Sequence, residues 1–372
     1  MYLEPPRRKN NTGGIVISVL LGIALGVWIY FRPPAALEVI IRPTPEPTVS
    51  QLSKEALLAE GDRLAEEGAI DEAISYYEKA TRVDPEHVPA FTRWARLLAW
   101  RRQYAEAVRI AQRAVEIDAQ SVEAQVTLGM ALDWAGRDQE AIVPLLRAIE
   151  LDPNYPRAYG YLAEAYADTN RLEKASEFAH RALDMAPDDA EVLRSMGYVA
   201  ERSGLYEQAI SYYEQAVTLQ PKWAPLYISL GQNYRVLGKN DEAIANFVRA
   251  VELDPTDPLA YDTLGLLYYV AEDYIAAAEQ FERALQADPD YGPAHGHLGW
   301  TAYVRRHYEV AIPHFERAIA LGETAVEYYY ELGLSYAYSG QCEAGIPWLK
   351  KALEMDPGSQ PALQGLEYCS RR

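Results

Sequence analysis

The chain has 372 residues, of which 54 are acidic and 35 are basic, so its formal net charge at pH 7 is −19. Residues 1–50 hold five basic and three acidic residues, which leaves a net charge of −21 on residues 51–372. Because nucleic acid attracts basic surfaces, this acidity argues against nucleic acid as a partner. A negative charge of this size is typical of a soluble, self-repelling surface. The alternative interpretation is that the acidic surface binds a basic partner.

Residues 1–14 are predicted to be a cytoplasmic segment, and residues 15–31 a transmembrane signal anchor. The sequence IVISVLLGIALGVWIYF is uncharged over seventeen residues, the lower end of the roughly 17–25 that span a bilayer. Three basic residues precede it and only Arg32 follows it directly, which predicts a cytoplasmic N-terminus and an extracytoplasmic remainder at the cell membrane. A cleaved signal peptide is the alternative, although the apolar core of such peptides is shorter, about 7–15 residues.

Two further features belong to this N-terminal part. Gly22 and Gly26 form a G-x-x-x-G motif, which would allow a homodimer through close packing of two membrane helices. Residues 32–52 contain five prolines and are predicted to form a semi-rigid linker of up to ~60 Å, at ~3.1 Å per residue. Such a linker would hold the rest of the chain clear of the membrane.

A period of 34 residues runs from residue 54 to residue 359 without an insertion or a deletion. Position 8 is always glycine or alanine, position 27 is always alanine, and position 32 is proline in seven of nine repeats. Repeat six shows the pattern with Tyr227, Leu230, Gly231, Tyr234, Ala243, Phe247, Ala250 and Pro255. Positions 4, 7, 8 and 11 share one helical face, as do 20, 24 and 27, and the proline ends the second helix. The period therefore predicts helical hairpins that must stack on their neighbours to bury their apolar faces.

This pattern resembles the tetratricopeptide repeat. The resemblance implies an all-α fold, a right-handed α-solenoid of nine helical hairpins over residues 53–359, with a capping helix at 360–372. The apolar segment 15–31 adds one transmembrane helix before it. The repeats are expected at 54–87, 88–121, 122–155, 156–189, 190–223, 224–257, 258–291, 292–325 and 326–359. Repeats two and eight carry Ala119 and Glu323 in place of proline, so irregular junctions are expected after them.

Positions 2, 5, 9 and 12 of each first helix point away from its packing face, and the resemblance implies that they line a concave groove. Their character changes from polar in repeats one to four to aromatic and apolar in repeats seven to nine. Exposed aromatic residues in a groove are typical of contact with a peptide, a helix or a sugar. The alternative is that these rings only pack on one another. The predicted partner-binding residues are Arg194, Tyr198, Arg235, Leu266, Tyr269, Trp300, Tyr303, Tyr330 and Leu334.

Histidine and cysteine residues gather near the C-terminus. His295, His297, His307 and His314 lie in repeat eight, but no cysteine or close carboxylate completes a ligand set, so no metal site is predicted. Cys342 begins the second helix of repeat nine, and Cys369 lies late in the capping helix. Because these helices are expected to be antiparallel neighbours, a disulfide between Cys342 and Cys369 is predicted for an oxidising compartment, with two free thiols as the alternative.

No phosphate-binding loop, nucleophile elbow, zinc-protease motif or paired C-x-x-C occurs in the sequence. We therefore predict no enzymatic activity and no cofactor. The predicted function is a membrane-anchored scaffold that binds a protein or peptide partner in the groove, and the resemblance extends this to organising an envelope complex. A glycan-binding envelope module is the alternative, because tyrosine and tryptophan also stack on sugar rings. A cytoplasmic adaptor would follow if the topology were reversed.

Overall fold

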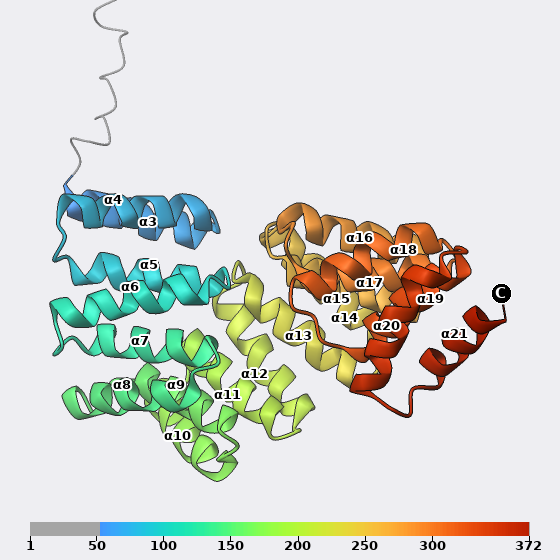
Figure 1. Ribbon diagram of the computed structural model, residues 1–372. Helices are drawn as coiled ribbons and strands as arrows, with labels where there is room; N and C mark the ends of the chain where they lie inside the picture. The colour runs from blue at the N-terminus through green and yellow to red at the C-terminus, as the bar shows by residue number, and fades with distance from the viewer. Residues whose placement is uncertain (1–52, 372) are drawn as a thin grey trace, which may run out of the picture. The chain divides into compact units, whose positions relative to one another are not determined.

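The computed structural model describes residues 53–371, and every regular element among them is an α-helix. Nineteen helices, α3 to α21, follow one another as stacked antiparallel hairpins (Figure 1). This arrangement confirms the predicted all-α solenoid. The predicted segment 1–14, transmembrane helix 15–31 and linker 32–52 lie outside the described residues. Within residues 53–371, no helix combines the length and the apolar character that a membrane span requires.

Each repeat contributes two helices of 13 or 14 residues. The first helices are α3 Lys54–Glu67, α5 Val88–Trp100, α7 Val122–Trp134, α9 Pro156–Asp168, α11 Ala190–Arg202, α13 Ala224–Val236, α15 Pro258–Val270, α17 Gly292–Val304 and α19 Val326–Tyr338. The second helices are α4 Ile70–Val83, α6 Tyr104–Ile117, α8 Asp138–Leu151, α10 Leu172–Met185, α12 Tyr206–Leu219, α14 Asn240–Leu253, α16 Tyr274–Ala287, α18 Tyr308–Ala320 and α20 Cys342–Met355. The chain ends with α21, Gln360–Ser370.

Small residues at position 8 let the two helices of a hairpin approach each other closely. A Cβ atom added to Gly231 would lie 2.8 Å from the ring of Phe247, and one added to Gly265 would lie 2.5 Å from the ring of Phe281. Where position 8 is alanine, in repeats two and four, position 24 is alanine as well. A larger residue at position 8 is therefore matched by a smaller one at position 24, as close packing requires.

The turn inside each hairpin needs a positive φ angle at the fifteenth residue of the repeat. Five repeats supply glycine at this position. The other four place a residue with a side chain there, namely Arg102, Asn170, Glu272 and Arg306, with φ between 58° and 62°. For a residue other than glycine or asparagine this conformation is unfavourable, so three of the nine turns carry local backbone strain.

An aspartate before the proline position can shape the junction between repeats where the proline is absent. After α6, the Asp118 carboxylate accepts a hydrogen bond from Gln120 N at 2.9 Å, and Ser121 caps α7. The same aspartate turn occurs at Asp152 with proline present, so the expected irregularity after repeat two is wrong. Repeat eight has Gly322 at this position, with φ 101°, and α18 ends early at Ala320. That junction is irregular, as predicted.

Repeat two also contacts repeats much later in the chain. The Trp100 and Trp223 rings lie 4.8 Å apart. Arg101 pairs with Asp254 and Thr256, and Arg102 Nε lies 3.3 Å from Asp257 Oδ2. We call this set, Trp100, Arg101 and Arg102 with Trp223, Asp254, Thr256 and Asp257, the closing contact. It joins the end of α5 to the junctions before α13 and α15.

The last helix covers the end of the solenoid. Helix α21 packs on α19 and α20, where Gly365 sits against the side chains of Leu334 and Leu349. A disulfide joins Cys342 to Cys369, with a Cα–Cα distance of 5.4 Å. The apolar end of repeat nine is thus covered by a helix that is also covalently attached.

Candidate functional site

Two of the predicted partner-binding residues, Arg194 and Tyr198, already bind other groups of the protein. Arg194 Nη1 lies 2.6 Å from Glu164 Oε1, and its guanidinium lies 4.5 Å from the centre of the Trp134 ring. The Tyr198 hydroxyl donates to Asp168 Oδ1 at 2.6 Å. Arg235, a third predicted residue, lies exposed near the end of α13. The structure therefore does not bring these three residues together as a free surface.

A buried charge network holds the first helices of repeats two, four and five together. Glu191 on α11 is 4% exposed. Its carboxylate lies 2.6 Å from Arg96 Nη1 and 3.0 Å from Arg157 Nη1, and it accepts a hydrogen bond from the Tyr161 hydroxyl at 2.7 Å. Burial opposes ionisation of Glu191, but Arg96 and Arg157 hold its pKa below the ordinary value. We call the side of the first helices that was expected to line the groove the inner face. In these repeats the protein's own ion pairs occupy it.

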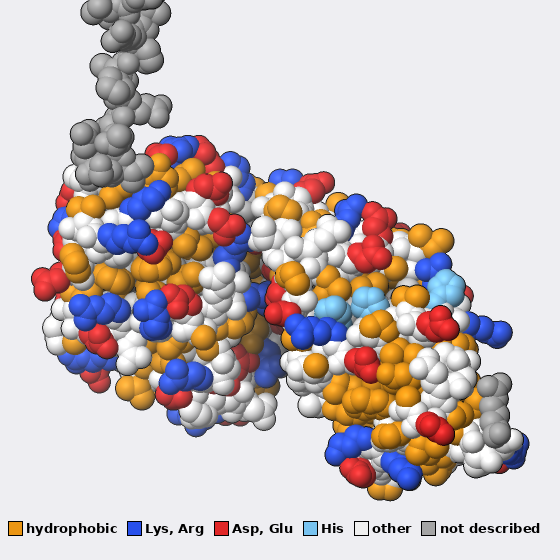
Figure 2. Space-filling view, turned by 45° about the horizontal axis from the view of Figure 1, so that its top comes forward, with side chains coloured by type: hydrophobic (Ala, Val, Ile, Leu, Met, Phe, Trp, Pro, Cys, Tyr) orange, Lys and Arg blue, Asp and Glu red, His pale blue; other side chains and the backbone are white. Residues whose placement is uncertain are grey.

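The corresponding face of repeats seven to nine carries aromatic rings. We define the aromatic groove as Tyr269 on α15, Trp300 and Tyr303 on α17, and Tyr330 on α19, all of which are half-buried. Hydrophobic side chains also gather on the surface of this C-terminal part of the solenoid (Figure 2). The aromatic residues that the sequence singled out therefore lie on three successive first helices and keep part of their surface exposed.

Most rings of the groove also pack on a neighbouring ring. Trp300 lies 5.2 Å from Tyr328 between ring centres. The rings of Tyr303 and Tyr308 are 5.7 Å apart, and those of Tyr269 and Tyr274 are 5.4 Å apart. Both sequence interpretations thus have a counterpart, because the rings pack on one another and still present exposed faces.

The two leucines assigned to the groove are mainly packing residues. Leu334 is 4% exposed and packs with Leu349 and Ala362, because α21 covers this side of α19. Leu334 is therefore not available as a groove contact, which corrects its assignment. Leu266 is half-buried beside Phe281 and Leu298.

Sequence reasoning missed Glu331 of α19, which lies among the groove residues. Its Oε2 atom is buried without a hydrogen-bond partner. Burial, reinforced by the charge of Glu327, raises the pKa of Glu331 to about 8. The Trp300 indole nitrogen beside it is also buried without a well-aligned hydrogen bond. Glu331 was missed because it occupies position 6 of its repeat, which is not one of the four positions expected to face the groove.

Glu331 interacts electrostatically with the tyrosines around it. Burial raises the pKa of the Tyr303 and Tyr330 hydroxyls, and the charge of Glu331 contributes to both increases. It contributes in the same way to the raised pKa of Tyr269. The charge of Glu331 therefore acts on tyrosines of α15, α17 and α19.

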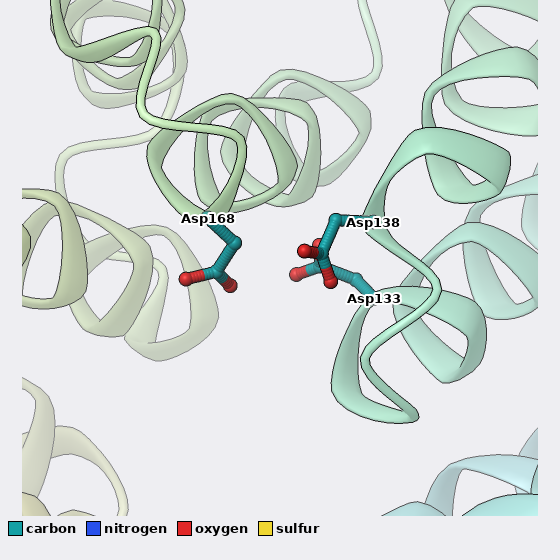
Figure 3. A group of neighbouring side chains, drawn as sticks. All are labelled: Asp133, Asp138 and Asp168. Atoms are coloured by element: carbon teal, nitrogen blue, oxygen red, sulfur yellow. The ribbon is translucent and has the colours of Figure 1, made fainter.

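The four histidines of repeat eight do not converge on one point. His297 Nδ1 lies 2.6 Å from Asp262 Oδ1, His295 and His314 contact each other with Nδ1 atoms 3.3 Å apart, and His307 is exposed. Within residues 53–371, one group of three potential metal ligands does converge, and it consists of Asp133, Asp138 and Asp168 (Figure 3). The sequence offered no signal for this group, because its members do not share one position of the repeat.

Comparisons with known proteins agree with this architecture. Tetratricopeptide repeat models match residues 64–125, 139–197, 190–222, 258–291 and 298–360, and a TPR repeat model matches residues 231–270. No curated protein matches the chain.

Similar folds occur among solved structures. In the crystal structure of the APC/C hetero-tetramer Cut9–Hcn1, a similar chain shares 18% identity over 87% of this chain, with a TM-score of 0.65, and this chain covers 64% of its length. The human IFIT1 dimer with PPP-AAAA shares 18% identity over 79% of this chain and 81% of that one, with a TM-score of 0.54. These likenesses concern the fold alone. With the repeat matches along its length, the chain belongs to the tetratricopeptide repeat proteins.

Proposed function

We propose that this chain is a protein-interaction scaffold whose aromatic groove binds an extended segment of a partner protein. A lysine or arginine side chain of that segment would lie against Glu331. The observation that carries the proposal is the Oε2 atom of Glu331, which is buried without a hydrogen-bond partner on a helix of the aromatic groove and beside Trp300.

Such a carboxyl group is costly for the free protein. A buried polar atom without a partner loses its hydration and gains nothing in return, so native structures rarely keep one without a purpose. A cationic side chain would supply the missing partner. The aromatic faces would add an attraction, because the π-system of an aromatic ring is negative on its face and attracts cations.

The charge of the whole chain favours the same kind of partner. The formal net charge of −19 raises the rate at which a basic segment meets this surface, and the effect falls with ionic strength. Within the groove, the aromatic rings would bury apolar side chains of the partner, and the carboxylate of Glu331 would bind a positively charged one. A basic segment with apolar neighbours satisfies both requirements.

A peptide-binding series tests this proposal. Peptides from a random library that bind the wild-type protein are resynthesised with each lysine or arginine replaced by glutamine. Their affinities are compared for the wild-type protein, Glu331→Gln and Trp300→Ala, with Glu343→Gln as the control, because Glu343 is exposed in the first turn of α20.

We expect the replacement of one basic peptide residue to lower the affinity for the wild-type protein most. That loss should disappear in Glu331→Gln, while Glu343→Gln should bind the peptides like the wild type. Bound peptides without basic residues, or affinities unchanged by Glu331→Gln, would contradict the proposal. If only glycans bind, and Trp300→Ala abolishes that binding, the chain is a glycan-binding module instead.

We further propose that residues 15–31 hold this scaffold at the cell membrane with the repeats outside the cytoplasm. The support is the apolar sequence of that segment and the basic residues before it. Deletion of residues 15–31 should move the protein from the membrane fraction to the soluble fraction. Added protease should degrade the repeats of the full chain in intact cells stripped of any outer layer. If the repeats survive, the proposed orientation is wrong.

A further inference from the structure

We propose that Asp133, Asp138 and Asp168 form a binding site for one calcium ion on the inner face of repeats three and four. The site is separate from the aromatic groove and does not depend on the function proposed for that groove.

The three carboxyl groups come from three different helices and point toward one another (Figure 3). Asp133 lies in the last turn of α7, Asp138 is the first residue of α8, and Asp168 is the last residue of α9. One oxygen atom from each side chain lies within 4.8 Å of the others. Three like charges at this spacing repel one another unless a cation or protons separate them.

Asp133 supplies an independent indication of a ligand. Its side chain is 4% exposed, and its Oδ1 atom has no hydrogen-bond partner within the protein. Burial, followed by the charges of Glu164 and Asp168, raises the pKa of Asp133 well above the ordinary value. A buried carboxyl group that lies beside two others and keeps an oxygen without a donor is a suitable ligand for a metal ion.

The neighbouring cations do not fill this position. Arg194 pairs with Glu164 at 2.6 Å. Arg202 Nε and the Tyr198 hydroxyl both lie on Asp168 Oδ1, at 3.2 Å and 2.6 Å. These contacts orient Asp168 and leave Asp133 Oδ1 without a partner. Arg202 therefore binds one aspartate of the site, and Arg194 is used by Glu164 outside it.

The ligand chemistry of the site favours calcium. All three ligands are carboxylate oxygens, which suit hard cations. Magnesium usually binds through one or two carboxylates and keeps several waters, whereas calcium takes more carboxylate ligands in a flexible geometry. Three converging carboxyl groups therefore favour calcium. The final turns of α7 and α9 place the negative ends of two helix dipoles at the site, and the start of α8 at Asp138 places one positive end there, so the sum favours a cation.

The site also opens to solvent. The three aspartates line a cavity of about 530 Å³, together with Trp134, Arg194 and Tyr198 among others. Calcium takes six to eight ligands, so water in this cavity can complete the coordination shell. The expected Kd is about 10⁻⁴–10⁻³ M, the range of calcium sites in extracellular modules.

Calorimetry with calcium chloride on the metal-free protein tests the assignment, in ~150 mM KCl to screen weak surface binding. We expect one calcium ion per chain and a rise in Tm. Asp133→Asn and Asp168→Asn should each weaken binding at least tenfold. Asp241→Asn, an exposed change in the first turn of α14, should leave it unchanged.

A comparison of Tm values in EDTA and in calcium distinguishes a metal site from a site in which Asp133 is simply protonated. In EDTA, Asp133→Asn should unfold at the same or a higher Tm than the wild type, because it removes a buried acidic group; in calcium, the wild type should be the more stable. If Asp133→Asn fails to fold, Asp138→Asn at the start of α8 replaces it in both measurements. Absence of calcium binding to the wild type, equal binding by the variants, or binding of magnesium in place of calcium would overturn the assignment.

Discussion

The first helices of repeats two to five and those of repeats seven to nine meet through different chemistry. In the first group, Arg96, Arg157 and Glu191 connect α5, α9 and α11 through short ion pairs. In the second, Trp300 and Tyr303 pack on neighbouring rings, His297 pairs with Asp262, and the Oε2 atom of Glu331 has no partner. The 34-residue hairpin is the same in both parts.

This difference separates stability from recognition within one fold. Where the inner face carries paired charges, as at Glu191, those groups are satisfied and offer little to a partner, and Asp133 is the acidic group there that keeps an oxygen without one. Where it is filled by partly exposed rings around an unpaired acid, the free protein keeps an unfavourable group that a partner can satisfy. The hairpin's core positions are nearly constant, so the two parts diverge only at positions that face inward.

The strongest test of the charged part is Glu191→Ala. Removal of this carboxylate leaves Arg96 and Arg157 buried without a counter-ion, so we expect a loss of about 3–5 kcal/mol in the free energy of unfolding. Urea denaturation measures it. Glu150→Ala, which removes an exposed i,i+3 pair with Arg147, should cost less than ~0.5 kcal/mol. Similar losses from both changes would show that the buried network is not what holds these helices together.

The disulfide gives the next largest effect, at the other end of the molecule. Cys342 and Cys369 are 27 residues apart in sequence, and a crosslink over a loop of this length contributes ~3 kcal/mol. We expect Cys342→Ser and the reduced wild type to lose protection of the α21 amides from hydrogen exchange. Unchanged protection would mean that contacts with Leu334 and Leu349 hold the cap without the bond.

The aromatic part should respond to pH through Glu331. Its pKa is raised from 4.5 to about 8 by burial, so below pH 4.5 the folded and unfolded chains both hold the proton and this group does not reduce stability. Between these values only the unfolded chain loses the proton, and the free energy of unfolding falls by up to ~1.4 kcal/mol per pH unit, levelling off above pH 8. Urea midpoints across this range should show the fall in the wild type but not in Glu331→Gln. A slope that persists in the variant would assign it to another group.

The smallest expected change in stability comes from replacing arginine by glycine in two turns of the same conformation. Arg306 and Arg102 both have φ near 60°, where glycine is less strained. Arg306→Gly should therefore stabilise the protein by ~1 kcal/mol. Arg102→Gly should not, because it also removes the pair with Asp257 in the closing contact. Equal stabilisation by both changes in urea denaturation would show that this pair contributes nothing.

The 34-residue period was sufficient to predict the hairpins, because glycine, alanine and proline at fixed positions report contacts within a repeat and to the next one. It predicted which positions face the groove, but not which side chains meet there. Arg96 and Glu191 are 95 residues apart, and their meeting depends on how each hairpin turns relative to the last, which the period does not encode. The same repeat position can therefore have different roles. Position 9 is the buried, ion-paired Glu164 in repeat four and the half-buried Trp300 in repeat eight. Asp133 and Asp168 escaped prediction for the same reason.

The closing contact changes how this solenoid should fold. In an open array each repeat contacts only its neighbours, so folding can start anywhere and spread. Here the bond from Arg101 to Asp254 spans 153 residues, and the entropy lost in closing so long a loop is recovered only after the intervening hairpins have formed. We therefore expect repeats two to six to fold and unfold as one cooperative block, with the contact between Trp100 and Trp223 among the last to form.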